Sequence, residues 1–218
     1  MFRPGDPLPN PGSMRDGKRV VKYNNLFSKM NSRNLKLDLT LWDTSNVVII
    51  SGLFFECKAS EIDVSKWDTS NVERMNQTFE GVELDKLDIT NWDTSKVIDM
   101  EGMFKTAEID DVDLSNFNME KVKSIRVMFH DARIPIINLG KCNANNIWEM
   151  YWTFEGAGVR TIDISCIDLT TGTSTENFAK FRGTPSTVYV KNLDSKNIVD
   201  SFMHPMDRNR VVIGSLNP

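Results

Sequence analysis

Apolar positions along the chain recur with a period of 25 residues. The clearest column holds Trp42, Trp67 and Trp92, and Phe117 continues it. Two further apolar columns follow five and twelve residues later: Val47, Val72, Val97, Val122 and Ile147, then Phe54, Phe79, Phe104, Phe129 and Phe154. A fixed period of this length is typical of solenoids, in which each unit buries its apolar face against its neighbours. We therefore predict that these columns form the core.

The pattern within one unit predicts a strand, a capped turn and a short helix. Residues 62–64 alternate apolar, polar and apolar, as a short half-buried strand does. Ser70 and Glu73 have the spacing of a capping box, which marks a helix start. The apolar residues of 72–79 then recur at helical spacing, and Gly81 permits the turn back toward the next strand.

These units predict an α/β solenoid, a leucine-rich-repeat-like right-handed coil with strands on one side and helices on the other. Residues 1–19 form a Pro-rich extended arm, residues 20–34 an N-terminal cap and residues 35–165 the regular repeats. Residues 166–218 hold degenerate repeats and a C-terminal cap. In that last part, 187–190 and 211–213 are expected to be strands because β-branched residues dominate them.

The WDTSNV segment at 67–72 and its copies resemble the 25-residue repeat of bacterial surface proteins, the DUF285 or BspA-like leucine-rich-repeat family. The resemblance covers residues 35–165 well and 166–204 loosely. It implies the solenoid fold, and it implies a role in adhesion or protein interaction. Such repeats are typical of mycoplasma and other bacterial surface proteins, and also occur in some protists and large DNA viruses.

Charge and hydropathy restrict the classes of partner. The net charge is −4, so neither nucleic acid nor an anionic membrane is an electrostatic target. The chain has no run of 18 apolar residues, and its N-terminal residues lack the apolar segment of a signal peptide. We expect a protein inside a cell or in a virus particle, or a cell-surface protein if the sequence has been trimmed.

The three cysteines are expected to be free thiols. Cys142 lies in the tryptophan column, and Cys166 lies one residue before the same column on the next unit. The two could approach each other, but alternating side-chain directions argue against a bridge. With Cys57 the number is odd, so we predict free thiols with Cys142 packed in the core.

The most regular polar column is Asp38, Asp63, Asp88, Asp113, Asn138 and Asp163. Strand alternation points these side chains out of the sheet, where they could bind a cation or form an acidic track for a basic partner. Alternatively they accept hydrogen bonds within the scaffold. We favour the scaffold, because the glycines of calcium-binding rolls are missing. A second polar column suits turns and caps: Asp43, Asp68, Asp93, Asn118, Asn143, Asp168 and Asp194.

No residues form a pattern typical of an active site. The two histidines, His130 and His204, have no metal-ligand spacing, and no nucleophile motif accompanies them. Gly-rich phosphate loops are missing as well. We therefore predict no catalytic residue, no cofactor and no small-molecule substrate, which means that the protein is not an enzyme.

An aromatic group is the best candidate for a partner contact. Trp148, Tyr151 and Trp152 surround the core position Met150, and the two tryptophans have the spacing of one helix face. Exposed aromatic pairs are common at interface centres, although packing against the C-terminal tail is the alternative. The N-terminal arm supplies further candidate contacts: Pro4, Pro7, Pro9 and Pro11.

The preferred hypothesis is a non-enzymatic repeat scaffold that binds protein partners as a structural subunit of a larger assembly, such as a virus particle. The alternative is a bacterial cell-surface adhesin-type repeat protein. A third hypothesis, an enzyme or a metal-binding β-roll, predicts cations on the Asp38–Asp163 column.

Overall fold

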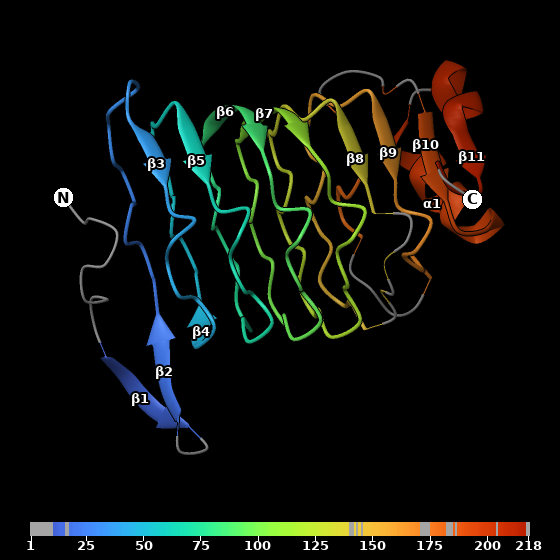
Figure 1. The fold of residues 1–218 in the computed structure, drawn as a ribbon. Coiled ribbons are helices and arrows are strands. Elements are labelled where there is room, and N and C mark those ends of the chain that lie inside the picture. The colour runs from blue at the N-terminus through green and yellow to red at the C-terminus, as the bar shows by residue number, and fades with distance from the viewer. Residues whose placement is uncertain are drawn as a thin grey trace.

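The chain coils repeatedly around one long axis, and successive coils stack side by side (Figure 1). The computed structural model describes residues 11–15, 18–139, 142, 144, 146–170, 175–181, 185, 187–203 and 205–216. Pro4, Pro7, Pro9, Asn143 and His204 lie outside the described residues. The described part contains no helix that is long and apolar enough to span a membrane.

One wall of the solenoid is built from short parallel strands, one per coil. They are β3 (Lys36–Asp38), β5 (Glu61–Asp63), β6 (Glu83–Leu87), β7 (Glu108–Val112), β8 (Ile136–Asn138) and β9 (Thr161–Asp163), followed by β10 (Thr187–Val190) and β11 (Val211–Ile213). Equivalent residues pair at the repeat period, so Leu37 lies opposite Ile62 and Ile137 opposite Ile162. The predicted strands and their parallel stacking are confirmed.

A second wall follows β4 (Val47–Ile49) and is held by single-residue bridges. Parallel bridges join Ile49 to Arg74, Arg74 to Asp99, Asp99 to Ser124 and Ser124 to Glu149. Two tight turns then lead each coil back toward the first wall. In one coil, the amide of Leu53 donates to the carbonyl of Ile50 and the amide of Cys57 to that of Phe54.

The predicted helix in each unit is wrong, because these segments form turns and cross-coil ladders. The amides of Met75, Gln77 and Phe79 donate to carbonyls of the next coil, at 3.0, 2.9 and 2.9 Å. Coils at strand spacing are about 4.8 Å apart, whereas a helix with its side chains is about 10 Å wide. Helices therefore cannot stack at this interval, and two successive turns satisfy the same apolar spacing.

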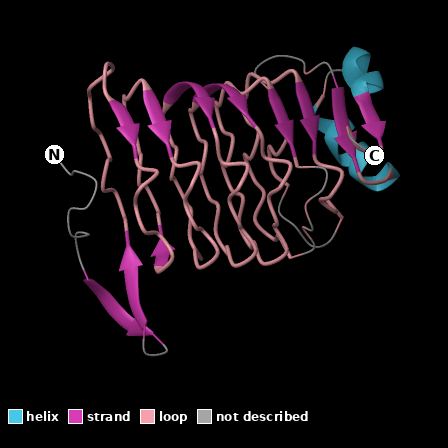
Figure 2. Cartoon of the chain, viewed as in Figure 1, coloured by secondary structure: helices cyan, strands magenta, loops and turns pink. Residues whose placement is uncertain are grey.

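Among the described residues, helices occur only at the C-terminal end (Figure 2). There α1 (Leu193–Phe202) starts at the N-cap Asn192, whose side chain accepts from the amide of Ser195. The 3₁₀ helix η1 (Pro205–Arg210) leads into β11, which pairs in parallel with β10. Both strands expected in this region, 187–190 and 211–213, are confirmed.

At the other end, β1 (Pro11–Arg15) and β2 (Lys18–Lys22) form an antiparallel hairpin. β2 also pairs in parallel with β4, and the hairpin projects beyond the coils (Figure 1). Residues 11–15 thus form a strand of a hairpin, which differs from the extended arm expected for the N-terminal segment.

Stacked aromatic rings run through the interior. Consecutive phenylalanines from Phe54 to Phe154 lie 5.5, 5.7, 5.6 and 5.3 Å apart by ring centroid and within 11° of parallel. Trp67 and Trp92 stack at 6.3 Å, and the indole Nε1 of Trp67 donates to the carbonyl of Leu39 at 2.9 Å. The columns starting at Val47 and Phe54 are fully buried, whereas Trp42 is only partly buried against them.

Candidate interaction surface

The first aspartate column is engaged in local hydrogen bonds. Oδ1 of Asp38 accepts from the amide of Thr40 at 3.0 Å and from its hydroxyl at 2.7 Å. Asp63, Asp88, Asp113 and Asp163 likewise accept from the amide two residues later. The hydroxyls of Thr40 and Thr90 lower the pKa of Asp38 and Asp88. These are Asx turns, which end each strand and turn the chain at the corner.

Asp163 has an additional partner at the C-terminal end of the column. Its side chain is fully buried, and Oδ2 accepts from the amide of Leu216 at 2.5 Å. The tail at 214–216 therefore folds back over this position of the first wall. Among the described residues, no group of three or more His, Cys, Asp or Glu side chains is arranged to hold a metal ion.

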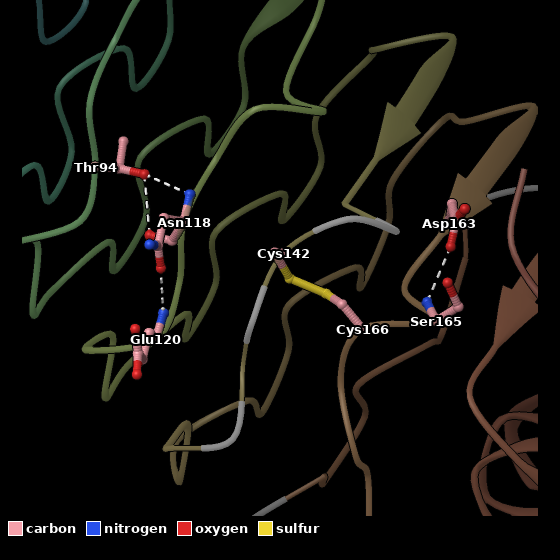
Figure 3. The surroundings of a disulfide bond; sticks show 7 residues. All are labelled: Thr94, Asn118, Glu120, Cys142, Asp163, Ser165 and Cys166. Atoms are coloured by element: carbon pink, nitrogen blue, oxygen red, sulfur yellow. Dashed lines mark hydrogen bonds between the residues drawn. A yellow bond between two sulfur atoms is a disulfide. The ribbon is translucent and has the colours of Figure 1, made fainter. Parts of the chain in front are cut away.

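The second polar column makes the same turn at the next corner. Asp43 accepts from both the amide and the hydroxyl of Ser45, and these bonds lower the pKa of Asp43. Thr94 then joins adjacent coils, because its hydroxyl contacts both the amide and the carbonyl of Asn118 (Figure 3). Asp194 is the exception to the column, since it lies in the first turn of α1.

The prediction of free thiols is wrong for two of the three cysteines. Cys142 and Cys166 form a disulfide between adjacent coils, with Cα atoms 5.4 Å apart (Figure 3). The alternation argument fails because Cys166 lies in the turn after β9, where side chains no longer alternate as in a strand. Cys57 is a free, buried thiol, and burial raises its pKa.

Charged side chains beside the first wall are paired across coils. In the shallow groove near Lys58, Glu83 pairs with both Lys58 and Arg33, and Arg133 pairs with Glu108 at 2.5 Å. The role that this geometry supports for the groove is mutual neutralisation of charges on neighbouring coils.

His130 is half-buried, with Nε2 3.3 Å from the Asp131 carboxylate and Nδ1 buried without a partner.

The aromatic residues lie on two adjoining parts of a coil. Trp148 is 55% exposed and lies on the second wall, whereas Tyr151 and Trp152 lie in the first turn after it. The Tyr151 and Trp152 rings meet edge to face at 5.4 Å, and the Arg126 guanidinium lies 5.4 Å from the Tyr151 ring centre. The shared helix face expected for the two tryptophans is wrong, because these residues form a turn.

The left-handed backbone at Val127 and Trp152 is a feature that the sequence analysis did not predict. Val127 and Trp152 occupy the left-handed region, with φ of 49° and 59°, where Gly52 and Gly102 stand in other coils. Left-handed backbone is unfavourable for a β-branched or bulky side chain. The glycines in the same column were the signal that could have marked this position from sequence.

The fold defines a non-helical solenoid repeat protein with an aromatic surface near its C-terminal end. The chain matches the family described as Mycoplasma protein of unknown function, DUF285, over residues 21–141 and again over residues 51–168. It therefore belongs to the DUF285 family, as the WDTSNV units indicated. Comparisons with curated proteins and with solved structures found no match.

Proposed function

We propose that the chain is a non-enzymatic repeat scaffold whose surface binds another protein. The observation that carries this proposal is the aromatic surface of Trp148, Tyr151 and Trp152. Trp152 holds a left-handed backbone that glycine would adopt at lower cost, so its side chain is retained against a local penalty. Trp148 is exposed, whereas Tyr151 and Trp152 are half-buried, and Arg126 lies against the Tyr151 ring. Tryptophan, tyrosine and arginine are the residue types enriched at interface hot spots.

The absence of catalysis is part of the proposal. In the polar columns that could have served as a site, Oδ1 of Asp38, Asp43 and Asp88 accepts from the amide and the hydroxyl of the same turn. Such bonds organise corners of the coil and favour the ionised carboxylate, which supports a structural role for these columns. A partner of protein nature is favoured over nucleic acid because the net charge is −4.

In its finer form, the proposal makes the chain a structural subunit of a larger assembly, such as a virus particle. The β1–β2 hairpin supports this form, because it projects from the end of the solenoid and offers a second contact (Figure 1).

A second candidate is an adhesin-type repeat protein of the bacterial cell surface. The disulfide between Cys142 and Cys166 favours it, because such bonds persist mainly in oxidising compartments. The two candidates differ in the redox state of these cysteines in the native source. Alkylation before and after reduction, read by mass spectrometry, would show the thiols free in a reducing compartment and blocked at a cell surface.

The mass of the species isolated from its native source tests the common proposal. Native mass spectrometry should find the 24.9 kDa chain in stoichiometric complex with protein. Trp148→Ala together with Trp152→Gly should release it, whereas Leu41→Ala, an exposed apolar side chain on another part of the coil, should not. Recovery of the free chain alone would contradict the proposal.

A further inference from the structure

The strand β3 is the N-terminal edge of the first wall. It pairs in parallel with β5, and in the described part of the chain it has no strand on its other side. Directly after β3, the amide of Leu39 donates to the carbonyl of Asp63 in β5. Backbone groups alternate in direction along a strand, so those of Lys36 and Asp38 point away from β5. Two N–H and two C=O groups therefore face outward at this edge, as a template for another strand.

The coil that contains β3 also leaves apolar side chains incompletely covered. Several of them are only partly buried against the core: Leu26, Met30, Leu37 and Trp42. By contrast Ile62, which pairs with Leu37 in the next coil, is 3% exposed. The cross-section of a solenoid is apolar, so an end coil without a neighbour exposes part of the core. A further strand placed beside β3 would cover Leu37.

The three residues of β3 are self-complementary when two copies pair antiparallel. A two-fold axis perpendicular to the first wall, placed beside Leu37, brings Leu37 opposite Leu37 of the second copy. Lys36 then lies opposite Asp38 of the second copy, and Asp38 lies opposite Lys36. Because the axis is normal to the sheet, these exposed side chains stay on the outward face in both copies. Each opposed pair exchanges two backbone hydrogen bonds, so every outward backbone group finds a partner.

Charge selects this register from its neighbours. A shift by two residues is the smallest that keeps the outward backbone groups paired and the faces matched, and it puts Lys36 opposite Lys36 or Asp38 opposite Asp38. Like charges directly opposite each other destabilise a strand pair, whereas opposite charges stabilise it. Lys36 keeps its ion pair with Glu61 of the next coil, at 2.6 Å, in the selected register.

We propose that β3 is the contact strand of an antiparallel homodimer, in which the first walls of two copies join edge to edge into one sheet. Pairing at an exposed strand edge is a recurring mode of recognition, and a two-fold contact is the commonest way in which one chain forms a closed assembly. The β1–β2 hairpin projects below the coils in Figure 1, whereas β3 lies near their upper edge. This contact goes beyond the proposed function, because Trp148 lies several coils away and stays exposed in both copies.

The small size of the contact sets its expected strength. One short strand from each copy buries less surface than a stable protein interface needs, so the dissociation constant should be on the order of 100 μM. Sedimentation of the full chain from about 10 μM to about 1 mM covers this range. The mass should rise from the 24.9 kDa of one chain toward that of two.

Charge reversal tests the pairing of Lys36 with Asp38. Lys36→Glu and Asp38→Lys should each weaken dimerisation roughly tenfold, since each places two like-charged pairs at the contact. An equimolar mixture of the two variants should restore association, because both pairs in the mixed dimer again have opposite charges. Recovery in the mixture also shows that each variant is folded. Lys86→Glu is the matched control: it lies in the same column inside the wall and also loses an ion pair, with Asp111, but should leave the dissociation constant unchanged.

A cysteine beside the axis tests the register. Leu37→Cys should form a covalent dimer on mild oxidation, because the Cα atoms of a non-hydrogen-bonded antiparallel pair are about 4.5 Å apart, within the range of a disulfide. Lys36→Cys is the control. Its two copies are diagonal to each other at roughly 7–8 Å, so a covalent dimer should not form.

The outcomes separate this contact from the aromatic surface. A wild-type chain that stays monomeric up to about 1 mM, or a mixture of the two charge variants that does not recover, would overturn the homodimer. Trp148→Ala should leave dimerisation unchanged. Loss of the dimer in that variant would place the contact at the aromatic surface and overturn the role of β3, while the proposed function would stand.

Discussion

Left-handed backbone positions explain residue choices that helix propensity does not. Six pairs of them, each four residues apart, run from Asn25 and Lys29 to Trp152 and Gly156, and most lie at the third residue of a hydrogen-bonded turn. The first column reads Gly52, Gln77, Gly102, Val127, Trp152 and Asn177. A positive φ at the third residue is the geometry of a type II turn, in which glycine or asparagine fits best.

The strain at Val127 can be measured. Val127→Gly should raise the free energy of unfolding by about 1 kcal/mol, because the left-handed penalty of a β-branched residue disappears. The reverse change, Gly102→Val, should lower it by a similar amount. At Gly102 an added Cβ would lie 3.5 Å from Gln77 Cγ, an ordinary contact, so the loss would report on the backbone. Changes of the same sign in the two variants would contradict this explanation.

The phenylalanine stack makes a second prediction at this scale. Phe104→Ala should cost about 3–5 kcal/mol in urea unfolding, because it opens a cavity between Phe79 and Phe129. Phe55→Ala is the matched control. Its ring is half-exposed beside Lys29, so the cost should be much smaller. A loss below about 1 kcal/mol at Phe104 would mean that its neighbours collapse into the space.

At the scale of elements, stacking decides between helix and turn. The apolar spacing in 72–79 fits a helix as well as it fits two turns, and the sequence alone favours the helix. Tertiary stacking reverses the choice, since neighbouring coils must remain at strand spacing. α1 forms at 193–202, where the chain leaves the regular repeat and the first wall is about to end.

The disulfide provides a test at the same scale. Cys166→Ser should lower the free energy of unfolding by about 3 kcal/mol, as expected for closing a 24-residue separation. Reduction of the wild-type protein should lower its urea midpoint to that of the variant, whereas reductant should leave the midpoint of Cys166→Ser in place. An unchanged wild-type midpoint on reduction would show that the cross-link adds nothing to stability.

For the whole molecule, repeated Asx turns predict acid sensitivity. Hydrogen bonds from the residue two positions later lower the pKa of five carboxylates: Asp38, Asp43, Asp88, Asp93 and Asp168. A pKa below that of the unfolded chain, about 3.9, adds stability at higher pH. That stability is present above the unfolded pKa and is lost as the pH falls through the folded pKa.

Urea midpoints measured from pH 7 to pH 2 should therefore fall, with most of the loss below about pH 4. Thr40→Val with Thr90→Val removes two of the hydroxyl donors while keeping side-chain shape. In this double variant the urea midpoint should fall less at low pH than in the wild type. The individual turns are exposed, so the effect of the pair is modest. A fall of the urea midpoint at low pH identical to that of the wild type would show that the hydroxyls do not couple protonation to folding.

The sequence by itself determined the period, the strands, the buried columns and the family, because 25-residue recurrence and two-residue alternation are local patterns. It also marked the aromatic residues, because tryptophan stands there at positions that other repeats of the same chain fill with different residue types. Tertiary structure decided the rest. It turned the predicted helices into turns, joined Cys142 to Cys166, and placed Trp148 at an exposed position on the second wall. The physical reason is shared: each depends on the roughly 4.8 Å distance between coils, which no single repeat contains.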